Sequence, residues 1–343
     1  MTQGTMKAAV YDPGSRRVEV KCVPVPQINE TEILVKISSA GLCHSDLMLL
    51  DGSFPGSPDP VIIGHEGAGV VQDVGARVAG FKPGDRVGFL PVKNCCFECR
   101  GCQVHNLNCE ETQAKLQGFA CDGYFAEYAA VDYRNAIVVP DEMDMRSAAV
   151  FFCAGVTAFN GVDGCQLKAG EWIAIIGCGG LGQMAVQYAK AMGLKVVGLD
   201  VNDAPLAAAK ACGADAILNT KSNGDYVREV KELTGGGADA AVVYSASWHA
   251  YHNAPKIIRV NGVMMVIGLP AKPLEVSSID LMLGLYRIKA ETTGPPWKLP
   301  KAISFTAKHG ITPKCAYYKL EDIGVMIANM QAGQTELRMV VEF

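Results

Sequence analysis

Ile173-Ala-Ile-Ile-Gly-Cys-Gly-Gly-Leu-Gly182 is the stretch of sequence that decides the fold of this chain. Its four apolar residues are typical of a buried strand, and a run of helix-forming residues continues from 181 to 192. The glycines between them have the spacing G-x-G-x-x-G: Gly177 allows a tight turn, Gly179 lets backbone approach a pyrophosphate, and Gly182 lets the helix pack on its strand. The helix N-terminus offers unpaired N–H groups to the phosphates. The stretch therefore predicts a dinucleotide-binding turn.

The residue that ends the next predicted strand bears on which dinucleotide binds. Residues 195–199 are expected to form that strand, and Asp200 follows it, 18 positions beyond Gly182. A carboxylate at this place accepts hydrogen bonds from both ribose hydroxyls of NAD and repels the 2′-phosphate of NADP. Val201 and Asn202 come next, so no arginine is present to neutralise that phosphate. The pattern favours NAD, although the glycines alone are also compatible with a flavodoxin-like turn that binds no nucleotide.

Composition and charge narrow the class of protein. The chain has 343 residues, of which 49% are hydrophobic and 19% are charged, and this favours two globular domains. A net charge of −4 does not favour binding to nucleic acid or to an anionic membrane. The N-terminal residues lack the apolar segment of a secretory signal, so we expect a soluble, cytoplasmic protein.

The order of predicted elements indicates an α/β protein. Residues 1–150 contain short strands typical of a partly open β-barrel, at 6–11, 17–22, 32–39, 67–74, 85–89 and 125–131. A helical passage at 145–162 leads into strands that alternate with helices, which is typical of a doubly wound parallel sheet. Its strands are expected at 172–176, 195–199, 215–218, 239–243, 263–267 and 286–290, and its helices at 181–192, 204–212, 222–233, 248–258 and 277–284. We assign 151–290 to this nucleotide domain, and 1–150 with 291–343 to the other.

Four of the 13 cysteines form a compact motif, Cys96-x-x-Cys99-x-x-Cys102-x6-Cys109. In a reducing compartment such spacing is more typical of metal than of disulfides. Four thiolates can enclose one tetrahedral Zn²⁺ and leave no open position, so this lobe, 93–111, is predicted to be a structural zinc site. Four chance buried cysteines are the alternative. Cys95 precedes the motif directly and could compete as a ligand, although it breaks the spacing.

A second set of metal-binding residue types is dispersed along the chain. Cys43 opens Cys-His-Ser-Asp, His65 lies in Gly-His-Glu-Gly, and Cys153 lies in Phe-Cys-Ala-Gly. Two cysteines and one histidine are ligands of a catalytic zinc that keeps one position open. From spacing alone this prediction is weak, because a lone histidine or cysteine is more often a core residue than a metal ligand.

Longer motifs around these residues resemble those of the zinc-dependent medium-chain alcohol dehydrogenases, and the resemblance covers nearly the whole chain. It is closest to the yeast-type branch, as judged from Gly-Leu-Cys-His-Ser-Asp-Leu (41–47), Gly-His-Glu-Gly-Ala-Gly-Val-Val (64–71), Lys-Pro-Gly-Asp (82–85), Cys-Ala-Gly-Val-Thr (153–157), Ala-Val-Gln-Tyr-Ala-Lys-Ala-Met-Gly (185–193) and Arg-Met-Val-Val (338–341). The cysteine lobe matches as well, but it is one residue shorter between Cys102 and Cys109. The resemblance implies a GroES-like β-barrel catalytic domain and a Rossmann domain.

The resemblance also implies roles for individual residues. Catalytic zinc would bind Cys43, His65 and Cys153, and Glu66 matches an acid that can enter the metal shell. Asp46 would orient His65, and the Ser45 hydroxyl would take the alcohol proton. The implied reaction is hydride transfer between NAD(H) and an alcohol or aldehyde that zinc polarises. In this family the backbone of 267–269 would face the nicotinamide, and His44 and Arg338 would contact the pyrophosphate. All the positions that would contact the cofactor are His44, Thr157, Gly177, Gly179, Gly180, Leu181, Gly182, Asp200, Ile267, Gly268, Leu269 and Arg338.

The chain departs from the yeast-type pattern at several positions. Asp51 stands where those enzymes carry the histidine that ends the proton relay, and an ordinary aspartate is a poor proton acceptor at neutral pH. Asp51 therefore either has a raised pKa, or is bypassed by water, or is a plain turn residue before Gly52. Met48, Leu90-Pro91 and the stretch 293–297 replace other residues near the substrate, which predicts a pocket wider and more apolar than ethanol needs.

Two other functions stay open from the sequence. One is a polyol dehydrogenase of the same superfamily, although such enzymes often lack the complete cysteine lobe. The other is a nucleotide-binding protein without activity, which would not need an open zinc site. The chain length and resemblance imply a homotetramer with two zinc ions per subunit that acts on a small molecule. Trp248, His249, Tyr251 and His252 form an aromatic cluster that we interpret as a domain or subunit surface.

Overall fold

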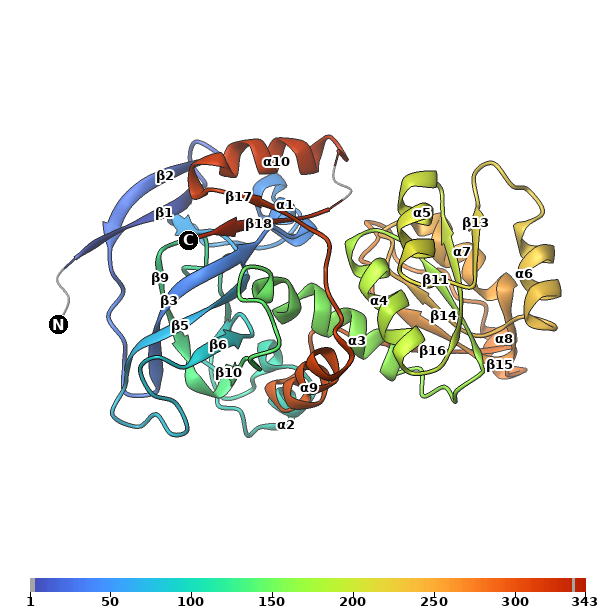
Figure 1. Ribbon diagram of the computed structural model, residues 1–343, viewed down its shortest axis with the longest axis horizontal. Helices are drawn as coiled ribbons and strands as arrows, with labels where there is room; N and C mark the ends of the chain where they lie inside the picture. The colour runs from blue at the N-terminus through green and yellow to red at the C-terminus, as the bar shows by residue number, and fades with distance from the viewer. Residues whose placement is uncertain (1–3, 335–336) are drawn as a thin grey trace. The chain divides into compact units, whose positions relative to one another are not determined.

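The computed structural model describes residues 4–334 and 337–343, which divide into two compact units. The first unit contains the described chain up to Ala154, Thr293–Gly310 and Lys314–Phe343, and the second contains Gly155–Thr292 with Ile311–Pro313. The chain therefore leaves the first unit after Ala154 and returns at Thr293, apart from the short segment Ile311–Pro313. As a consequence the last strand, β18 (Arg338–Glu342), lies beside β3 (Glu32–Gly41) from the start of the chain (Figure 1).

The second unit is built on one parallel sheet. Its six strands have the order β13-β12-β11-β14-β15-β16, and every neighbouring pair is parallel. This confirms the doubly wound α/β fold, because the order reverses between the first and fourth strands of the unit. The strands are β11 (Trp172–Ile176), β12 (Lys195–Asp200), β13 (Ala216–Asn219), β14 (Ala238–Val243), β15 (Ile258–Val266) and β16 (Tyr286–Ala290).

The helices of this unit follow the strands as the alternation predicts. Ile173, Ala174 and Ile175 in β11 are fully buried, as expected for a central strand covered on both faces. Helices α4 and α5 pack against β11–β13, and α6 and α7 pack against β14 and β15. The helices are α3 (Ala154–Asp163), α4 (Gly180–Ala191), α5 (Asp203–Ala211), α6 (Tyr226–Thr234), α7 (Trp248–Ile257) and α8 (Ser278–Met282).

The first unit is mostly β, which confirms the expected barrel-like domain. Its larger sheet has the order β10-β6-β5-β3-β18-β17, with β9 also paired to β3, and its smaller sheet has the order β2-β1-β4. Ile33, Val35 and Ile37 lie on one face of β3 and are at most 1% exposed, so this face belongs to the main core, whereas Leu34 on the other face packs in a second, smaller cluster. The remaining strands are β1 (Thr5–Asp12), β2 (Arg17–Pro24), β4 (Val61–Ile62), β5 (Glu66–Val74), β6 (Arg86–Phe89), β9 (Tyr128–Asp132), β10 (Ala136–Val138) and β17 (Cys315–Tyr318).

Short helices and one hairpin complete the first unit. The cysteine lobe lies between the strands β7 (Val92–Lys93) and β8 (Lys115–Leu116), which pair with each other. Its helices are α2 (Arg100–Val104) and the 3₁₀ turn η1 (Asn106–Asn108). The other helices are α1 (His44–Asp51), η2 (Tyr133–Asn135), η3 (Ala148–Phe152), η4 (Pro296–Lys298), α9 (Leu299–His309), η5 (Leu320–Asp322) and α10 (Ile323–Gln331). None of the described helices is long and apolar enough to cross a bilayer.

The helical passage expected at 145–162 is broken at Cys153. The 3₁₀ turn η3 ends at Phe152, Cys153 has φ −135° and ψ −72°, and α3 starts at Ala154. Ser39 fixes the start of the turn, because its buried hydroxyl donates to the Met145 carbonyl (2.7 Å) and accepts from the Ala149 N–H (3.3 Å). Phe152 fixes its end, since the ring packs directly over Gly88 of β6. Tertiary contacts therefore turn Cys153 out of the helix.

Three other element starts differ from the sequence prediction by three residues or more. The strand expected at 125–131 starts at Tyr128, because the preceding residues form only an isolated bridge through Ala126. The helix expected from 222 starts at Tyr226, since the Asn219 side chain accepts two backbone N–H groups and holds a turn there. The strand expected from 263 starts at Ile258 and contains an irregularity in its pairing with β14.

Gly88 should be a position where one methyl group is costly. A Cβ atom on Gly88 would overlap the Phe152 ring, which is fully buried. We predict that Gly88→Ala lowers the free energy of unfolding by about 3 kcal/mol, as overpacked cores do. Gly324→Ala is the matched control, because it lies in α10 with nothing within 4 Å of the added atom. It should leave stability equal or raise it by about 1 kcal/mol. Equal denaturation midpoints for the two variants would contradict the prediction.

Candidate active site and metal centre

Four residues from three separate segments of the sequence meet in the first unit. They are Cys43, His65, Glu66 and Cys153, and their potential ligand atoms all lie within 4.8 Å of one another. Cys43 is the N-cap of α1, His65 and Glu66 stand at the start of β5, and Cys153 is the residue at which η3 gives way to α3. The structure thus brings together the whole dispersed set, which spacing alone could not separate from core residues.

Asp46 fixes the orientation of the His65 ring. The carboxylate oxygen Oδ1 accepts a hydrogen bond from His65 Nδ1 at 2.8 Å, and Oδ2 accepts from the Cys43 backbone N–H at 2.8 Å. Asp46 is 1% exposed, so both bonds lie away from water. Burial lowers the pKa of His65, but the Asp46 carboxylate outweighs it and the pKa is raised well above its usual range. Because Nδ1 is occupied, Nε2 is the ring nitrogen that faces the cluster.

The spacing and the donor types fit a zinc ion. Cys153 Sγ lies 3.3 Å from His65 Nε2. Tetrahedral zinc with bonds of about 2.3 Å to sulfur and 2.0 Å to nitrogen places two such ligands roughly 3.6 Å apart. The pKa of Cys43 lies well below its usual range, because the Cys153 thiol donates a hydrogen bond to it and His65 stabilises the thiolate. The pKa of Cys153 is raised, because this thiol is the donor in that hydrogen bond and is buried.

Glu66 is the acid of the cluster, and Arg338 holds it. One guanidinium nitrogen of Arg338 lies 2.6 Å from each carboxylate oxygen, and Glu66 is fully buried. Burial raises the pKa of Glu66 to about 7, against the opposing effect of Arg338. Gly41 leaves the room for this pair, because a Cβ atom there would overlap the carboxylate. Nε of Arg338 is buried without a partner among the described residues, so one donor remains for another anion.

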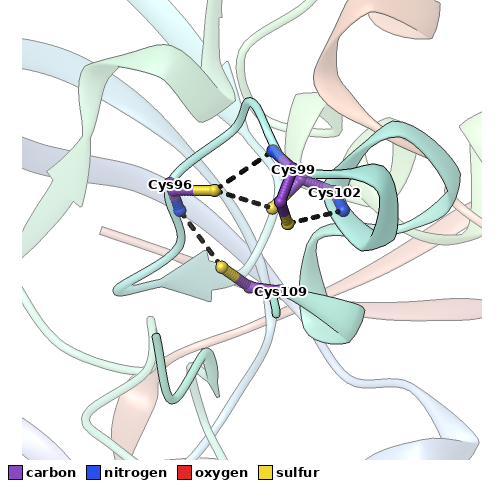
Figure 2. A group of neighbouring side chains, drawn as sticks. All are labelled: Cys96, Cys99, Cys102 and Cys109. Carbon is purple, nitrogen blue, oxygen red and sulfur yellow. Dashed lines mark hydrogen bonds between the residues drawn. The ribbon is translucent and has the colours of Figure 1, made fainter. Parts of the chain in front are cut away.

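The second cluster is the cysteine lobe, which Figure 2 shows in close-up. The Sγ atoms of Cys96, Cys99, Cys102 and Cys109 lie within 4.8 Å of one another. Cys96 and Cys102 are 3.9 Å apart, close to the roughly 3.8 Å that two sulfurs of a tetrahedral zinc site require. Four sulfur ligands close the coordination shell, so the lobe could hold a structural metal.

Backbone N–H groups surround the sulfurs of this lobe. Cys96 Sγ accepts from the N–H groups of Glu98 and Cys99 at 3.4 and 3.3 Å, and Cys99 Sγ accepts from Cys102 and Glu110 at 3.4 and 3.3 Å. Such bonds favour the thiolate form that binds metal. The Thr112 hydroxyl lies 3.1 Å from Cys109 Sγ, and this contact lowers the pKa of Cys109 to about 5.

Cys95 does not belong to this sulfur cluster. Among the described residues, the four-membered group excludes it, and its side chain packs in the small apolar core of the lobe with Val92. Burial raises the pKa of Cys95 to about 12. The geometry therefore favours the four motif cysteines over Cys95 as metal ligands.

The glycine turn of the second unit has the conformation that the motif predicts. Gly177 has φ 91°, and a Cβ atom there would lie 2.9 Å from the Ser245 nitrogen. A Cβ atom on Gly182 would overlap the Gly177 carbonyl, so only glycine lets α4 approach its strand. Gly179 caps α4 with nothing within 4 Å of its Cβ position, and Gly180 and Leu181 form the first turn of the helix. The open side at Gly179 leaves space for a phosphate.

A pocket of about 260 Å³ lies beside this turn. It is slightly smaller than the pockets that enclose whole drug-sized ligands, which suits one half of a dinucleotide. Asp200 stands at its wall and accepts from the N–H groups of Cys178 (2.8 Å) and Asn202 (3.0 Å). No lysine or arginine is among the described residues of the lining, which are Ile176, Gly177, Leu199, Asp200, Val201, Thr220, Tyr226, Ser245, Ser247, His249, Ala250, Asn253, Ala254 and Ile257.

The remaining expected cofactor residues lie in three places. His44 is exposed at the first turn of α1, whereas Thr157 is buried in α3. Ile267, Gly268 and Leu269 follow the end of β15. The backbone of this segment is tied back to the sheet, because the Gly268 N–H donates to the Val243 carbonyl at 2.9 Å.

Asp51 is a turn residue at the end of α1. Its Oδ1 accepts from the Ser53 N–H at 2.8 Å, and bonds from Ser53 lower the pKa of the carboxyl. The hypothesis of a raised pKa is therefore wrong, and the turn interpretation is favoured. Ser45, in contrast, stays beside the cluster, with its Oγ 3.9 Å from Cys43 Sγ.

Sequence reasoning missed two kinds of contributing residue. Ser39 is an inconspicuous serine in a strand, and only the fold brings it against the turn before Cys153. The aromatic cluster around Trp248 was interpreted as a surface, but Tyr251 is 4% exposed and His249 lines the pocket. The helical spacing of 251, 254 and 257, all buried, is the signal that could have separated the two faces.

Comparison with known proteins supplies the family. Residues 29–141 match the alcohol dehydrogenase GroES-like domain, and residues 180–308 match the zinc-binding dehydrogenase domain. An alcohol dehydrogenase of Geobacillus stearothermophilus is 39% identical over 98% of this chain and 99% of its own length. An alcohol dehydrogenase of Moraxella is 34% identical over 98% of this chain and 99% of its own.

Solved structures give the same result. The alcohol dehydrogenase of the archaeon Aeropyrum pernix superposes with a TM-score of 0.87 at 27% identity, covering 98% of this chain and 100% of that one. The acetophenone reductase of Geotrichum candidum, solved with NAD, gives a TM-score of 0.85 at 27% identity and covers 100% and 98%. With both domains matched and both sets of potential metal ligands assembled, this chain belongs to the zinc-dependent alcohol dehydrogenase family of oxidoreductases.

Proposed function

We propose that this chain transfers a hydride between NAD(H) and an alcohol or aldehyde, with one catalytic and one structural zinc ion in each subunit. The observation that carries the proposal is the meeting of Cys43, His65 and Cys153, with the His65 ring already oriented by Asp46. Two thiols and one imidazole form a ligand set that leaves a fourth position for substrate. A protein that only binds nucleotide would have no use for this arrangement.

When they are bound, zinc polarises the substrate oxygen and the nicotinamide accepts or delivers the hydride. The protein's part is to hold geometry and charge. Asp46 keeps Nδ1 of His65 protonated and so leaves Nε2 available as a ligand. Glu66 places a further carboxylate at the cluster, and Arg338 balances its charge while both are buried.

Ser45 is the residue proposed to take the substrate proton. Its hydroxyl stands near Cys43 Sγ and is half-buried, which suits a short step from substrate oxygen to Ser45 Oγ. Asp51 is a poor end point for that proton, because its own bonds to Ser53 stabilise the carboxylate. We therefore propose that water, not Asp51, receives the proton from the serine side.

The preference for NAD over NADP rests on Asp200. The carboxylate lies at the pocket wall, and the described lining offers no cation to a 2′-phosphate. A phosphate placed there would meet a negative charge without compensation. A structural relative was solved with NADP, so the cofactor differs among proteins of this fold and has to be measured for this chain.

The substrate is proposed to be bulkier than ethanol. The support is the replacement of expected residues by Met48, Leu90-Pro91 and the stretch ending at Trp297. Met48 is half-buried on α1, four positions beyond His44, and Trp297 is 48% exposed. The acetophenone reductase among the structural relatives is named for a bulky ketone.

A homotetramer is the proposed assembly. Leu281, Met282 and Leu283 in and after α8 expose 40%, 74% and 62% of their surface, and they precede β16, the last strand in the sheet order. Such a row of apolar side chains beside an open sheet edge is typical of an interface between copies. A solution mass of one 36.4 kDa chain by light scattering would contradict the proposal.

The function is tested with purified, zinc-loaded protein and a graded panel of substrates. We expect turnover with NADH well above that with NADPH, and higher kcat/KM for aromatic and branched aldehydes than for acetaldehyde. The panel includes a polyol, because preference for it would assign the chain to the polyol dehydrogenases. Preference for ethanol would leave the reaction but contradict the substrate size, and preference for NADPH would contradict the role of Asp200.

The two metal sites can be separated by metal analysis. We predict two zinc ions per chain in the wild type and one in Cys109→Ala, because three sulfurs no longer close the lobe. Cys95→Ala is the matched control, since it removes a neighbouring thiol that lies outside the cluster, and it should retain two. The melting temperature should fall further in Cys109→Ala. One zinc ion in Cys95→Ala would show that Cys95 is a ligand.

The role of Asp51 is tested by its amide. Asp51→Asn removes the charge but keeps an acceptor for the Ser53 N–H. Because we place the proton on water, the dependence of kcat on pH should be the same as in the wild type between about pH 5 and 9. A shifted or lost ionisation in that range would return Asp51 to the relay.

A further inference from the structure

One buried hydroxyl of the second unit is used by none of the steps above. Tyr251 lies in α7 and is 4% exposed. Its phenolic oxygen accepts a hydrogen bond from the Ile267 N–H at 3.2 Å and donates to the Gly268 carbonyl at 2.5 Å. The Val243 carbonyl lies further away, at 3.4 Å. A buried tyrosine usually finds one partner, whereas this one holds two consecutive backbone groups.

The segment that Tyr251 holds lies at the functional edge of the sheet. The ladder between β14 and β15 ends at the pair Val243 and Val266, so the chain leaves the sheet at Ile267. A Cβ atom on Gly268 would overlap the Ser245 carbonyl, which shows how closely the segment packs on the end of β14. Beyond it, Leu269 is 63% exposed. Tyr251 therefore supports this backbone from the core side while the other side is open.

Topology indicates what approaches that open side. Ligands of a doubly wound sheet bind outside the carboxyl ends of the strands, across the point where the strand order reverses. Here the reversal lies between β12 and β14, on the two sides of β11. The pocket with Asp200 lies at the ends of β11 and β12 and is bounded by Ser245, Ser247 and α7, which follow β14. The second half of a dinucleotide would extend past this pocket, toward the end of β15.

We infer that Tyr251 is a positioning residue for the nicotinamide half of the cofactor, acting through the backbone of Ile267 and Gly268; this rests on the proposed NAD-dependent function. The same helix also serves the adenosine half, because His249, Ala250 and Asn253 line the pocket, whereas Tyr251 is not among the lining residues. Burial raises the pKa of Tyr251 to about 12, so the hydroxyl remains a donor throughout the neutral range.

The test uses Tyr251→Phe and two ligands that differ by the nicotinamide. The variant keeps the ring in the apolar core and removes only the oxygen. Dissociation constants of zinc-loaded protein are measured by calorimetry for NADH and for ADP-ribose. We expect NADH to bind at least about fivefold more weakly, because the loss of even one of the two hydrogen bonds has an effect of about that size, with kcat lowered as well. ADP-ribose should bind within about twofold of the wild type, since its contacts are untouched.

Thr234→Val is the matched control for general loss of stability. The Thr234 hydroxyl is also buried in the second unit, donates to the Val230 carbonyl (2.6 Å) and accepts from the Gly237 N–H (3.0 Å). It should lower the melting temperature and leave the ratio of the two dissociation constants unchanged. Gly268→Ala displaces the same backbone by another route, and it should reproduce the selective loss of NADH affinity.

Two results would overturn the inference. A ratio of NADH to ADP-ribose affinity in Tyr251→Phe equal to that of the wild type would show that the tyrosine is only structural. Hydrogen exchange gives a second measurement, because the Ile267 amide should exchange faster in this variant, and unchanged exchange would contradict the bond itself. Wild-type protein that binds ADP-ribose but not NADH would refute the proposed function, and the inference with it.

Discussion

The ion pair between Glu66 and Arg338 joins residues 272 positions apart, and the arrangement of the first unit depends on it. Both side chains are almost completely buried, so removing either partner would leave an uncompensated charge away from water, at a cost of about 3–5 kcal/mol. Because Arg338 opens β18 and Glu66 opens β5, the pair places the last strand next to β3 and leaves the carboxylate at the metal cluster. Gly41 is required for the same reason, since any larger residue would overlap Glu66.

The two potential metal sites show what sequence reasoning can and cannot supply. The cysteine lobe is local: four sulfurs within 14 residues, with the backbone N–H groups of the same loop around them, so spacing alone predicted it. The catalytic set is dispersed over 111 residues, and its geometry comes from contacts that no spacing encodes. There the motifs of a resembling family were needed. Only the structure could show that the Cys95 side chain lies outside the group of four sulfurs.

The fold was predictable where local pattern and tertiary environment agree. The strands and helices of the second unit were expected within a few residues, because central parallel strands are continuous apolar runs and glycine turns separate them. The break at Cys153 could not be read in this way. Residues 145–162 have a helical pattern, but Ser39 and Gly88, from two other strands, decide that the helix stops and restarts. The departure from local preference lies at a proposed metal ligand, where such conflicts are concentrated.

Helix α7 illustrates how one element can serve binding and reaction separately. Several of its side chains line a pocket where affinity for the adenosine half can be gained without constraining chemistry. Tyr251, in contrast, contacts backbone rather than ligand, and backbone has no rotamers to lose when a ring packs on it. Hydride transfer depends on distances held to a fraction of an ångström, whereas affinity tolerates small displacements. A rigid main-chain surface at the reacting half and side-chain contacts at the distant half therefore match the different demands of the two ends of the cofactor.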